Sequence, residues 1–429
     1  MPKTEIFQPA EILLPQEGTD YERWACVACD QFTSEPEYWR QADAFVGTAP
    51  STLRMILPEA YLEAPDAARR IERAHQAMEQ YAGGLLTQKV RGFVYVERTT
   101  SSGLRQGLVG AVDLEAYSYE PGAGPAVRPS ERTVTQRIPP RLAVRQGGCL
   151  EAPHILLLID DADASVLEPL AREKQRLRPL YDTPLMLGGG RCAGWAVEGP
   201  ALVERLAAKV DALGSQEAFD RRYPRAAGRA PFTAAVGDGN HSLATAKAYW
   251  EAVKLTLRPE ERERHPARLC LVELCNLHSP AIGIEAIHRA VTGVTFDRLC
   301  EDFTAWLDAR GAVRRAGAAA QRLEVLSPDG RSRALAWDNG PEPLAVGTLE
   351  AFLAEWMPGC PQAAVDYIHG EASLRGLCAQ GAVGILLPDP AKSGLLEGVA
   401  LGGVLPKKTF SMGHAQEKRY YLECRRIVP

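Results

Sequence analysis

The stretch TAAVGDGNHSLATAKAYWEAVK at residues 233–254 limits the possible folds of this chain more than any other segment. A short apolar run ends in Gly-Asp-Gly-Asn-His, and apolar residues then recur at helical spacing. We therefore predict a strand at 232–236 and a helix that begins at His241, with only a tight turn between them. Glycines permit positive φ angles and close approach of the backbone to a ligand. A helix start also presents free N–H groups and the positive end of the helix dipole. The pattern favours a binding site for phosphate or another anion at Gly237 and Gly239.

The polar residues of this turn allow two interpretations. Asp238 and His241 are residue types that transfer protons or bind metals, and Asn240 and Ser242 can hydrogen-bond a ligand. Alternatively, Asp238 or Asn240 caps the helix in an Asx-type turn. The residues alone leave both interpretations open.

The wider pattern alternates strands and helices, which indicates an α/β (mixed α+β) protein. The further predicted strands cover residues 91–97, 106–114, 154–160, 269–274, 322–326 and 384–387, and a helix is predicted at 200–213. A chain of 429 residues is long enough for two domains. We expect an N-terminal α/β lobe at 1–222, a linker at 223–231 (YPRAAGRAP), and a lobe at 231–429 with the turn and a basic C-terminal segment. Residues 121–145 and 181–195 are predicted to be long loops.

Composition excludes several classes of protein. The net charge of −5 argues against a general nucleic-acid-binding protein. The sequence contains no apolar run near the roughly 20 residues of a membrane-spanning helix. The N-terminal residues lack a signal-peptide layout, and ten cysteines are scattered along the chain. We therefore expect reduced thiols and a cytoplasmic protein. The Cys26 and Cys29 pair is predicted to be structural, since a second pair and a nearby histidine are missing.

Several motifs resemble those of a bacterial and archaeal family called domain of unknown function ten-fifteen. The matching segments are FQPAEILLP (7–15), ACDQFTSEPEYW (28–39), LMLGGG (185–190), GDGNHS (237–242), NLHSPAIGIEAIHR (276–289), DYIHG (366–370) and LPKKTFSMGHAQEKRYYLE (405–423). The Gly-Asp-Gly-Asn-His turn also resembles the Asp-Gly-x-His-Arg turn of the ParB and sulfiredoxin-like superfamily, which includes free-serine kinases. This resemblance implies a ParB/sulfiredoxin-like lobe, nucleotide phosphates on the turn, and a first strand at 7–15 that pairs near it.

Two departures from that motif limit what the resemblance implies. Ser242 stands where the kinase and ParB motif has arginine, so a phosphate contact is missing or comes from elsewhere in the chain. Sulfiredoxin chemistry needs a cysteine just before the histidine, and this chain has Asn240 there. Reduction of a sulfinic acid is therefore not expected.

The C-terminal residues from 405 to 426 carry an excess of positive charge in an otherwise acidic protein. One interpretation is a phosphate clamp. Its predicted members are Lys408, Thr409, Ser411, His414 and Lys418. The other interpretation is a solvated basic tail, although the aromatic residues interleaved with the charges favour packing against the protein.

Three further segments contain candidate site residues. Arg132 and Arg141 lie in a charged segment that resembles a family element and are predicted to neutralise a second anionic group; an exposed loop is the alternative. Asp30 is a candidate general base or Mg²⁺ ligand, with local helix capping as the alternative. His288 and Arg289 resemble a family His-Arg element and are predicted to contact the ligand directly or to support the site from the core.

These residues suggest a phosphotransferase that acts on a small metabolite. The resemblance makes free L-serine the leading acceptor, while ATP, ADP and pyrophosphate remain open as donors. Asp238 or Asp30 would orient or deprotonate the acceptor hydroxyl, and Mg²⁺ is expected to bridge donor oxygens. A nucleotide- or phosphate-sensing protein without turnover and a small-molecule phosphatase are the alternatives.

Overall fold

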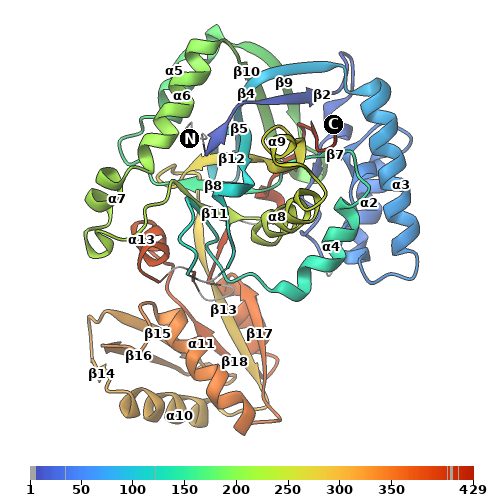
Figure 1. Ribbon diagram of the computed structural model, residues 1–429. Helices are drawn as coiled ribbons and strands as arrows, with labels where there is room; N and C mark the ends of the chain where they lie inside the picture. The colour runs from blue at the N-terminus through green and yellow to red at the C-terminus, as the bar shows by residue number, and fades with distance from the viewer. Residues whose placement is uncertain (1–5, 34, 121, 403, 406–408, 414) are drawn as a thin grey trace. The chain divides into compact units, whose positions relative to one another are not determined.

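The computed structural model of the chain describes residues 6–429 except 34, 121, 403, 406–408 and 414 (Figure 1). The chain forms two compact units. Unit 1 contains the described residues of Met1–Ile282, Val399–Gly403 and Gly413–Pro429, and unit 2 those of Gly283–Gly398 and Val404–Met412. Helix α13 (Lys392–Gly402) crosses from the residues of unit 2 to those of unit 1.

Unit 1 is built on one large mixed sheet. Within the described residues this sheet is 10-stranded. Its main path runs through β6 (Val127–Arg128), β11 (Ala234–Asp238), β8 (Leu156–Ile159), β12 (Leu269–Asn276), β5 (Gly103–Asp113), β4 (Gln88–Thr100), β10 (Arg191–Val197) and β9 (Arg178–Pro184). Strand β1 (Phe7–Gln8) pairs with β5, and β2 (Ala10–Leu14) pairs with β4. Most neighbours are antiparallel, but β12 runs parallel to β8 and β11 parallel to β6.

Successive strand residues point to opposite sides of this sheet, and the residues on both sides are buried in hydrophobic cores. On β4, Val94 and Val96 enter one hydrophobic core, while Phe93 and Tyr95 enter the other. The helices of unit 1 are α1 (Tyr21–Trp24), α2 (Pro36–Val46), α3 (Ala67–Gln80), α4 (Ile138–Arg145), α5 (Leu167–Glu173), α6 (Pro200–Leu213), α7 (Gln216–Arg222), α8 (Asn240–Lys254) and α9 (Pro259–Arg262). Buried residues of α2 and α3 contribute to the first core, and those of α5, α6 and α8 to the second.

The C-terminal residues are part of unit 1 and do not form a solvated tail. Strand β20 (Tyr420–Tyr421) pairs with β3 (Cys26–Val27), and β21 (Arg425–Arg426) pairs with β7 (Leu150–Glu151). Their charges are buried in pairs: Arg419 with Glu273 at 2.8 Å and with Glu423, and Arg425 with Glu151 at 2.7 Å. Among the basic residues that the structure describes here, Arg419 and Arg425 are therefore neutralised by buried glutamates, and Lys418 pairs with Asp238.

Unit 2 is a smaller sheet covered by helices on both faces. Its strands are β14 (Val313–Arg314), β16 (Ser332–Asp338), β15 (Gln321–Leu326), β18 (Val383–Leu386), β13 (Ile284–Thr292) and β17 (Ala364–His369) in spatial order, with β19 (Phe410–Met412) paired to β13. Helices α10 (Phe296–Ala309) and α11 (Ala345–Trp356) pack on the face that holds Val325 and Val291. Helix α12 (Glu371–Cys378) packs on the other face, with Leu326 and Ala290.

The structure confirms the mixed α/β class and corrects the predicted organisation. The division between the units falls after Ile282, whereas the sequence placed it near 223–231. The reason is that strands from both sides of the predicted linker pair within one sheet, as β11 does with β8 and β12 does with β5. The predicted loop at 181–195 is largely the β9–β10 hairpin, and the one at 121–145 contains helix α4. The first strands pair with β4 and β5, so their expected pairing next to the Gly-Asp-Gly-Asn-His turn was wrong.

Among the helices of the described residues, none has both the length and the apolarity to cross a membrane.

Candidate functional site

The Gly-Asp-Gly-Asn-His turn joins β11 directly to α8, as the sequence predicted. Asp238 is the last residue of β11, and α8 begins at Asn240. Gly239 between them has φ of +83°, and a Cβ atom there would lie 3.1 Å from Ile155 Cα. Glycine is therefore required both for the left-handed backbone and for the close packing on β8's N-terminal flank. The start of α8 has no side-chain capping bond, so the interpretation of Asp238 or Asn240 as a helix cap was wrong.

A neighbouring loop fixes the first residues of α8. The Ser130 N–H donates to Asn240 Oδ1 at 3.2 Å, and Asn240 Nδ2 donates to Ser130 Oγ at 3.2 Å. The Val134 N–H donates to His241 Nε2 at 3.2 Å. Exposed Arg132 lies between these two anchored loop residues. Its guanidinium is therefore carried on a loop that is fixed at the helix start.

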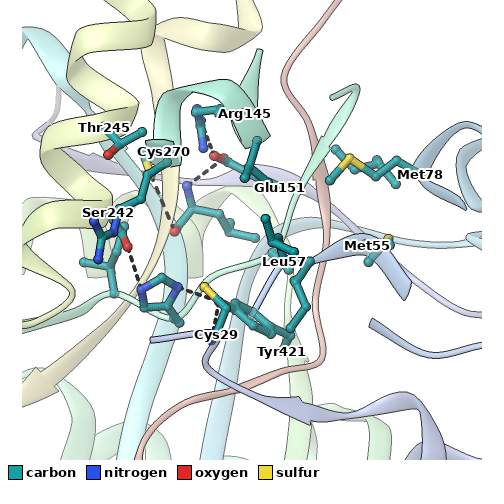
Figure 2. Close-up of a pocket in the computed structure, with 18 of the residues that line it drawn as sticks. Cys29, Met55, Leu57, Met78, Arg145, Glu151, Ser242, Thr245, Cys270 and Tyr421 are labelled. Carbon is teal, nitrogen blue, oxygen red and sulfur yellow. Dashed lines mark hydrogen bonds and ion pairs between the residues drawn. The ribbon is translucent and has the colours of Figure 1, made fainter. Parts of the chain in front are cut away.

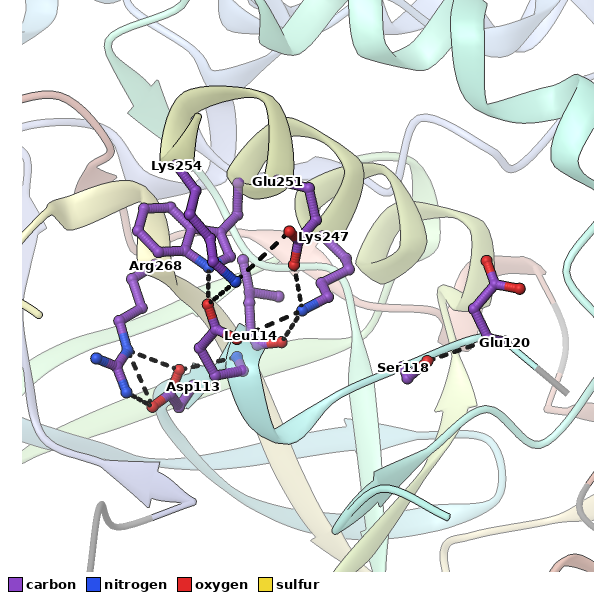
Figure 3. A network of polar contacts seen from close by, with 10 residues as sticks. Asp113, Leu114, Ser118, Glu120, Lys247, Glu251, Lys254 and Arg268 are labelled. Atoms are coloured by element: carbon purple, nitrogen blue, oxygen red, sulfur yellow. Dashed lines mark hydrogen bonds and ion pairs between the residues drawn. The ribbon is translucent and has the colours of Figure 1, made fainter. Parts of the chain in front are cut away.

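The other end of α8 is held by a separate polar network (Figure 3). Lys254 Nζ lies 2.6 Å from Glu115 Oε1, and Trp250 Nε1 donates to the same carboxylate oxygen at 2.7 Å. Lys247 donates to the Leu114 carbonyl at 2.9 Å. These contacts fix the position of the helix relative to the sheet and contribute no group to the site.

Lys418 interacts electrostatically with two carboxylates that lie far apart in the sequence, those of Asp238 and Asp30. Its Nζ lies 3.3 Å from Asp238 Oδ2, and only 9% of the Lys418 side chain and 17% of the Asp238 side chain are exposed. The positive charge of Lys418 also acts on Asp30. Oδ2 of Asp238 is buried and has no hydrogen-bond partner. This oxygen is therefore a candidate acceptor for a proton or a contact for a bound cation.

His154 links Asp30 to the first turn of α8. Its Nε2 forms a 2.7 Å hydrogen bond with Ser242 Oγ and lies 3.9 Å from Asp30 Oδ2. On the other side of the ring, Nδ1 forms a 2.8 Å hydrogen bond with the Tyr421 hydroxyl. That hydroxyl also accepts the Cys29 N–H at 3.1 Å. Ser242, which stands where related turns have arginine, thus bonds to a histidine of the same site.

Electrostatics keep Asp30 ionised. Burial alone would raise its pKa, but the electrostatic interaction with His154, the hydrogen bond from Gln31 and the charge of Lys418 outweigh burial and lower the pKa of Asp30. Glu59 behaves in the opposite way. Burial, reinforced by the negative charge of Asp30, raises the pKa of Glu59 despite its ion pair with Arg141. The site therefore contains one carboxyl with a lowered pKa, that of Asp30, and one with a raised pKa, that of Glu59.

Buried Arg98 on β4 fixes the backbone that carries Lys418. Its Nη1 donates to the Lys418 carbonyl at 2.9 Å, and its Nη2 donates to the carbonyls of Gln416 at 2.7 Å and Gly189 at 2.6 Å. The guanidinium also lies over the Tyr420 ring, 4.7 Å from the centroid. Five N–H donors in a rigid plane suit this task, because one side chain can bind several carbonyls at once.

The β4–β5 turn holds the same segment from a second side. The Glu417 carboxylate accepts from the Ser101 hydroxyl at 2.6 Å and from the Ser102 N–H at 3.0 Å. Arg105 donates to the Glu417 carbonyl at 2.9 Å. Lys418 therefore projects from a backbone that is fixed on both sides, and its ammonium position is set by the fold of unit 1.

A cavity of about 150 Å³ adjoins these groups in unit 1 (Figure 2). His154, Ser242, Glu59 and Arg141 line it together with mostly apolar side chains. Arg141 pairs with Glu59, so the predicted anion-neutralising arginine already has a buried counter-charge.

Comparison with known proteins gives the family. The family described as "Protein of unknown function (DUF1015)" matches residues 13–425. The chain belongs to the DUF1015 family. No curated protein matches this DUF1015 chain.

Solved structures show weaker likenesses to the DUF1015 chain. A structure described as "Free serine kinase in complex with AMP" is 11% identical, with 74% of this chain and 91% of that chain covered and a TM-score of 0.38. A conserved hypothetical protein from Pyrococcus furiosus is 11% identical, with 74% and 94% covered and a TM-score of 0.34. SbnI with a C-terminal truncation, from Staphylococcus aureus, is 12% identical, with 71% and 82% covered and a TM-score of 0.35. Likeness at this level carries no conclusion about activity.

Other residues predicted for the DUF1015 site are placed differently. Lys408 and His414 lie outside the described residues. Thr409 and Ser411 belong to unit 2, where Thr409 lines a separate cavity and Ser411 lies opposite Glu285 on β13. Neither is among the residues gathered around the turn in unit 1.

His288 and Arg289 are buried in unit 2, which agrees with the core alternative of their prediction and not with direct ligand contact. Arg289 is fully buried, pairs with Glu350 at 2.8 Å and lies over the Tyr367 ring. His288 Nδ1 accepts the Leu387 N–H at 3.3 Å. Because their surroundings on β13 are apolar, both polar side chains need partners, and they find them on neighbouring strands and helices of unit 2.

Sequence reasoning missed three members of the DUF1015 site: His154, Glu59 and Tyr421. His154 precedes a buried apolar strand and was included in the predicted core strand. Glu59 belongs to a short 3-10 helix, and Tyr421 to the C-terminal strand β20. The one available signal in the sequence was His154, which begins an apolar run. A buried polar side chain there needs a hydrogen-bond partner.

The described residues also limit how this protein could bind Mg²⁺. They contain no group of three or more His, Cys, Asp or Glu side chains arranged to hold a metal ion. Mg²⁺ usually binds one or two carboxylates together with substrate phosphates and water. Asp238, whose buried Oδ2 pairs with Lys418 but accepts no hydrogen bond, fits that mode and could hold a Mg²⁺ that arrives with a phosphorylated donor.

Proposed function

We propose that this protein is a small-molecule kinase that transfers a phosphoryl group to a metabolite hydroxyl. The observation that carries the proposal is the shared ammonium of Lys418, 3.3 Å from Asp238 and close enough to Asp30 to lower its pKa. Phosphoryl transfer requires aligned reactants and neutralised charge, and little covalent participation by the protein. An ammonium paired with a carboxylate beside a helix start is suited to that task.

In the proposed reaction the donor phosphates bind at the turn from Gly237 to His241. Lys418 and exposed Arg132 neutralise their charge, and Mg²⁺ supplies further neutralisation of the donor oxygens when bound. The acceptor hydroxyl attacks phosphorus as the bond from phosphorus to the donor oxygen breaks. The hydroxyl proton passes to Asp238 or Asp30.

Free L-serine is the first acceptor to test, because the turn resembles that of free-serine kinases. ATP, ADP and pyrophosphate are the donors to compare. The ten cysteines are all free thiols, which supports a reducing compartment such as the cytoplasm.

A donor and acceptor screen tests the proposal. The purified protein is incubated with Mg²⁺, each donor and L-serine, and phosphorylated products are followed by ³¹P NMR. Phosphoserine formation supports the kinase. Release of phosphate to water from a phosphorylated metabolite, with no transfer to an acceptor, would favour a phosphatase. Donor binding by calorimetry with neither reaction would favour a sensing protein.

A further inference from the structure

The arginines and glutamates that line the cavity beside the site are paired with each other, which limits the net charge of a ligand that the cavity can bind. Two arginines line it, and each is paired with a glutamate of the same lining (Figure 2). Arg145 Nη2 lies 2.5 Å from Glu151 Oε2, and Arg141 pairs with Glu59. A ligand with a single net charge would have to break one of these pairs in a partly buried environment.

Apart from His154, the rest of the lining is uncharged and mostly apolar. Met55, Leu57 and Met78 lie on one side of the cavity and Cys270 on the other, and Leu271, next to Cys270 on β12, also lines it. Burial raises the pKa of the Cys270 thiol, so this group stays neutral. Apolar walls favour a ligand whose body is hydrocarbon, because each buried apolar atom leaves water.

Polar groups that can bind a ligand hydroxyl lie at one end of the cavity. Ser242 Oγ and His154 Nε2 both line it, and they hydrogen-bond to each other at 2.7 Å. His154 Nε2 also lies 3.9 Å from Asp30. Asp30 does not line the cavity, so a hydroxyl placed beside His154 would reach this candidate base only by way of the histidine.

We infer that this cavity binds the acceptor, and that the acceptor is an uncharged alcohol with an apolar body of about the size of a benzene ring. Its volume of about 150 Å³ is that at which an apolar protein cavity holds benzene. The inference rests on the proposed kinase activity and narrows its substrate class, since a compact apolar alcohol fits these walls better than zwitterionic serine. Its hydroxyl oxygen would form the new bond to phosphorus, its proton would pass by way of His154 to Asp30, and the donor oxygen would leave.

Benzyl alcohol is the probe, and two substitutions on α4 separate the cavity from the rest of the helix. Val144 lines the cavity, whereas the adjacent Ala143 is exposed and does not. Val144→Phe adds a ring to the cavity wall, and Ala143→Phe adds the same ring on the outer side. The melting temperature without ligand shows whether each full-length variant folds.

Binding is measured first, by the rise in melting temperature with benzyl alcohol concentration and by ligand-observed NMR. We expect binding to the wild type and to Ala143→Phe, and affinity at least about tenfold weaker for Val144→Phe because the added ring occupies the cavity. Absence of binding to the wild type, or equal binding to both variants, would overturn the inference whether or not the protein is a kinase.

Transfer is measured second, by comparing L-serine with benzyl alcohol as acceptors under the same donor conditions. Preferential phosphorylation of benzyl alcohol supports the assigned substrate class. If benzyl alcohol binds but only serine is phosphorylated, the cavity does not hold the acceptor and the inference fails while the kinase stands. If benzyl alcohol binds in the cavity and no acceptor is phosphorylated, the proposed function fails while the ligand class of the cavity is supported.

Discussion

Lys418 Nζ lies 3.3 Å from Asp238 Oδ2 in the largely buried region where β11 passes into α8. The two residues meet because Arg98 binds the backbone carbonyls of Gln416 and Lys418. The ammonium is therefore held in place before any ligand binds. Such pre-organisation lowers the cost of ordering a charged side chain around a phosphate.

Lys418→Met should weaken binding of a phosphorylated donor. The substitution retains a long flexible side chain and removes the charge. We expect a loss of about 1.5–3 kcal/mol, the usual value of a hydrogen bond to a charged group. Isothermal titration calorimetry with ATP, ADP and pyrophosphate measures it. Lys209→Met is the control, since Lys209 binds the Ser165 carbonyl elsewhere in unit 1. Equal donor affinity in all three proteins would count against Lys418 as a phosphate ligand.

Gly239→Ala should destabilise the protein more than Gly228→Ala. Both glycines have positive φ, +83° and +78°, so both substitutions strain the backbone by about 1–2 kcal/mol. Only at residue 239 would the new Cβ press on Ile155, 3.1 Å away, whereas nothing lies within 4 Å at residue 228. The difference between the two free energies of unfolding in urea isolates the cost of that crowding. Equal losses of stability in the two variants would mean that the backbone at Ile155 moves away from the new Cβ at no cost in free energy.

The sequence was sufficient to predict the turn, because its signal is local. A run of apolar residues, two glycines and a helical periodicity lie within residues 233–254, and β11 and α8 follow within one or two residues of their predicted bounds. The same holds for α6, predicted at 200–213 and observed at Pro200–Leu213. Local patterns of this kind depend little on which other segments pack nearby.

The partners of the turn were only partly predictable, because tertiary pairing brings them there. Lys418 was predicted among several basic residues, but its sequence context does not distinguish it from Arg419, which is buried against Glu273. His154 was hidden in an apolar run. The predicted domain boundary was wrong for the same reason, since pairing of β11 with β8 depends on contacts between distant segments.

Arg419→Met should be strongly destabilising. Arg419 is 1% exposed and pairs with Glu273 and Glu423, which are both fully buried. Its removal leaves buried Glu423 without its counter-charge and Glu273 with only Arg105, 3.5 Å away, for which we expect a loss of about 3–5 kcal/mol. Arg178→Met removes an exposed arginine that pairs with Glu198 and should change stability by about 1 kcal/mol or less. Urea unfolding curves compare the two, and similar losses would contradict the assigned role of the buried cluster.

Asp30→Asn should alter how stability depends on pH. The folded-state pKa of Asp30 lies below 3.8, because His154 and Lys418 together outweigh the effect of burial. A carboxyl with a depressed pKa binds fewer protons in the folded state than in the unfolded state. Its contribution to stability is therefore complete above the unfolded pKa and is lost as pH falls through the folded one.

The measurement is the difference in free energy of unfolding between wild type and Asp30→Asn from about pH 7 to about pH 3, the range over which a carboxyl titrates. We expect that difference to shrink below about pH 4, where the unfolded carboxyl begins to bind a proton. Exposed Asp163 in the same unit gives the control, Asp163→Asn, whose difference from wild type should stay flat. A flat difference for Asp30→Asn as well would argue against its interaction with His154 and Lys418.

Asp238→Asn separates catalysis from architecture. The substitution preserves size but removes charge and basicity, so the carboxylate can neither accept a proton nor contact a cation. Because α8 has no side-chain cap, Asn at 238 should leave the helix start intact and the melting temperature close to that of the wild type. If Asp238 is the base or the cation contact, turnover should fall by about 10²–10⁴-fold, the usual range for a general base. The rate is measured with the donor and acceptor that the screen identifies, and Asp163→Asn again gives the control. A variant with normal melting temperature and normal turnover would assign proton transfer to Asp30 instead, since the charge of Lys418 also acts on that carboxylate.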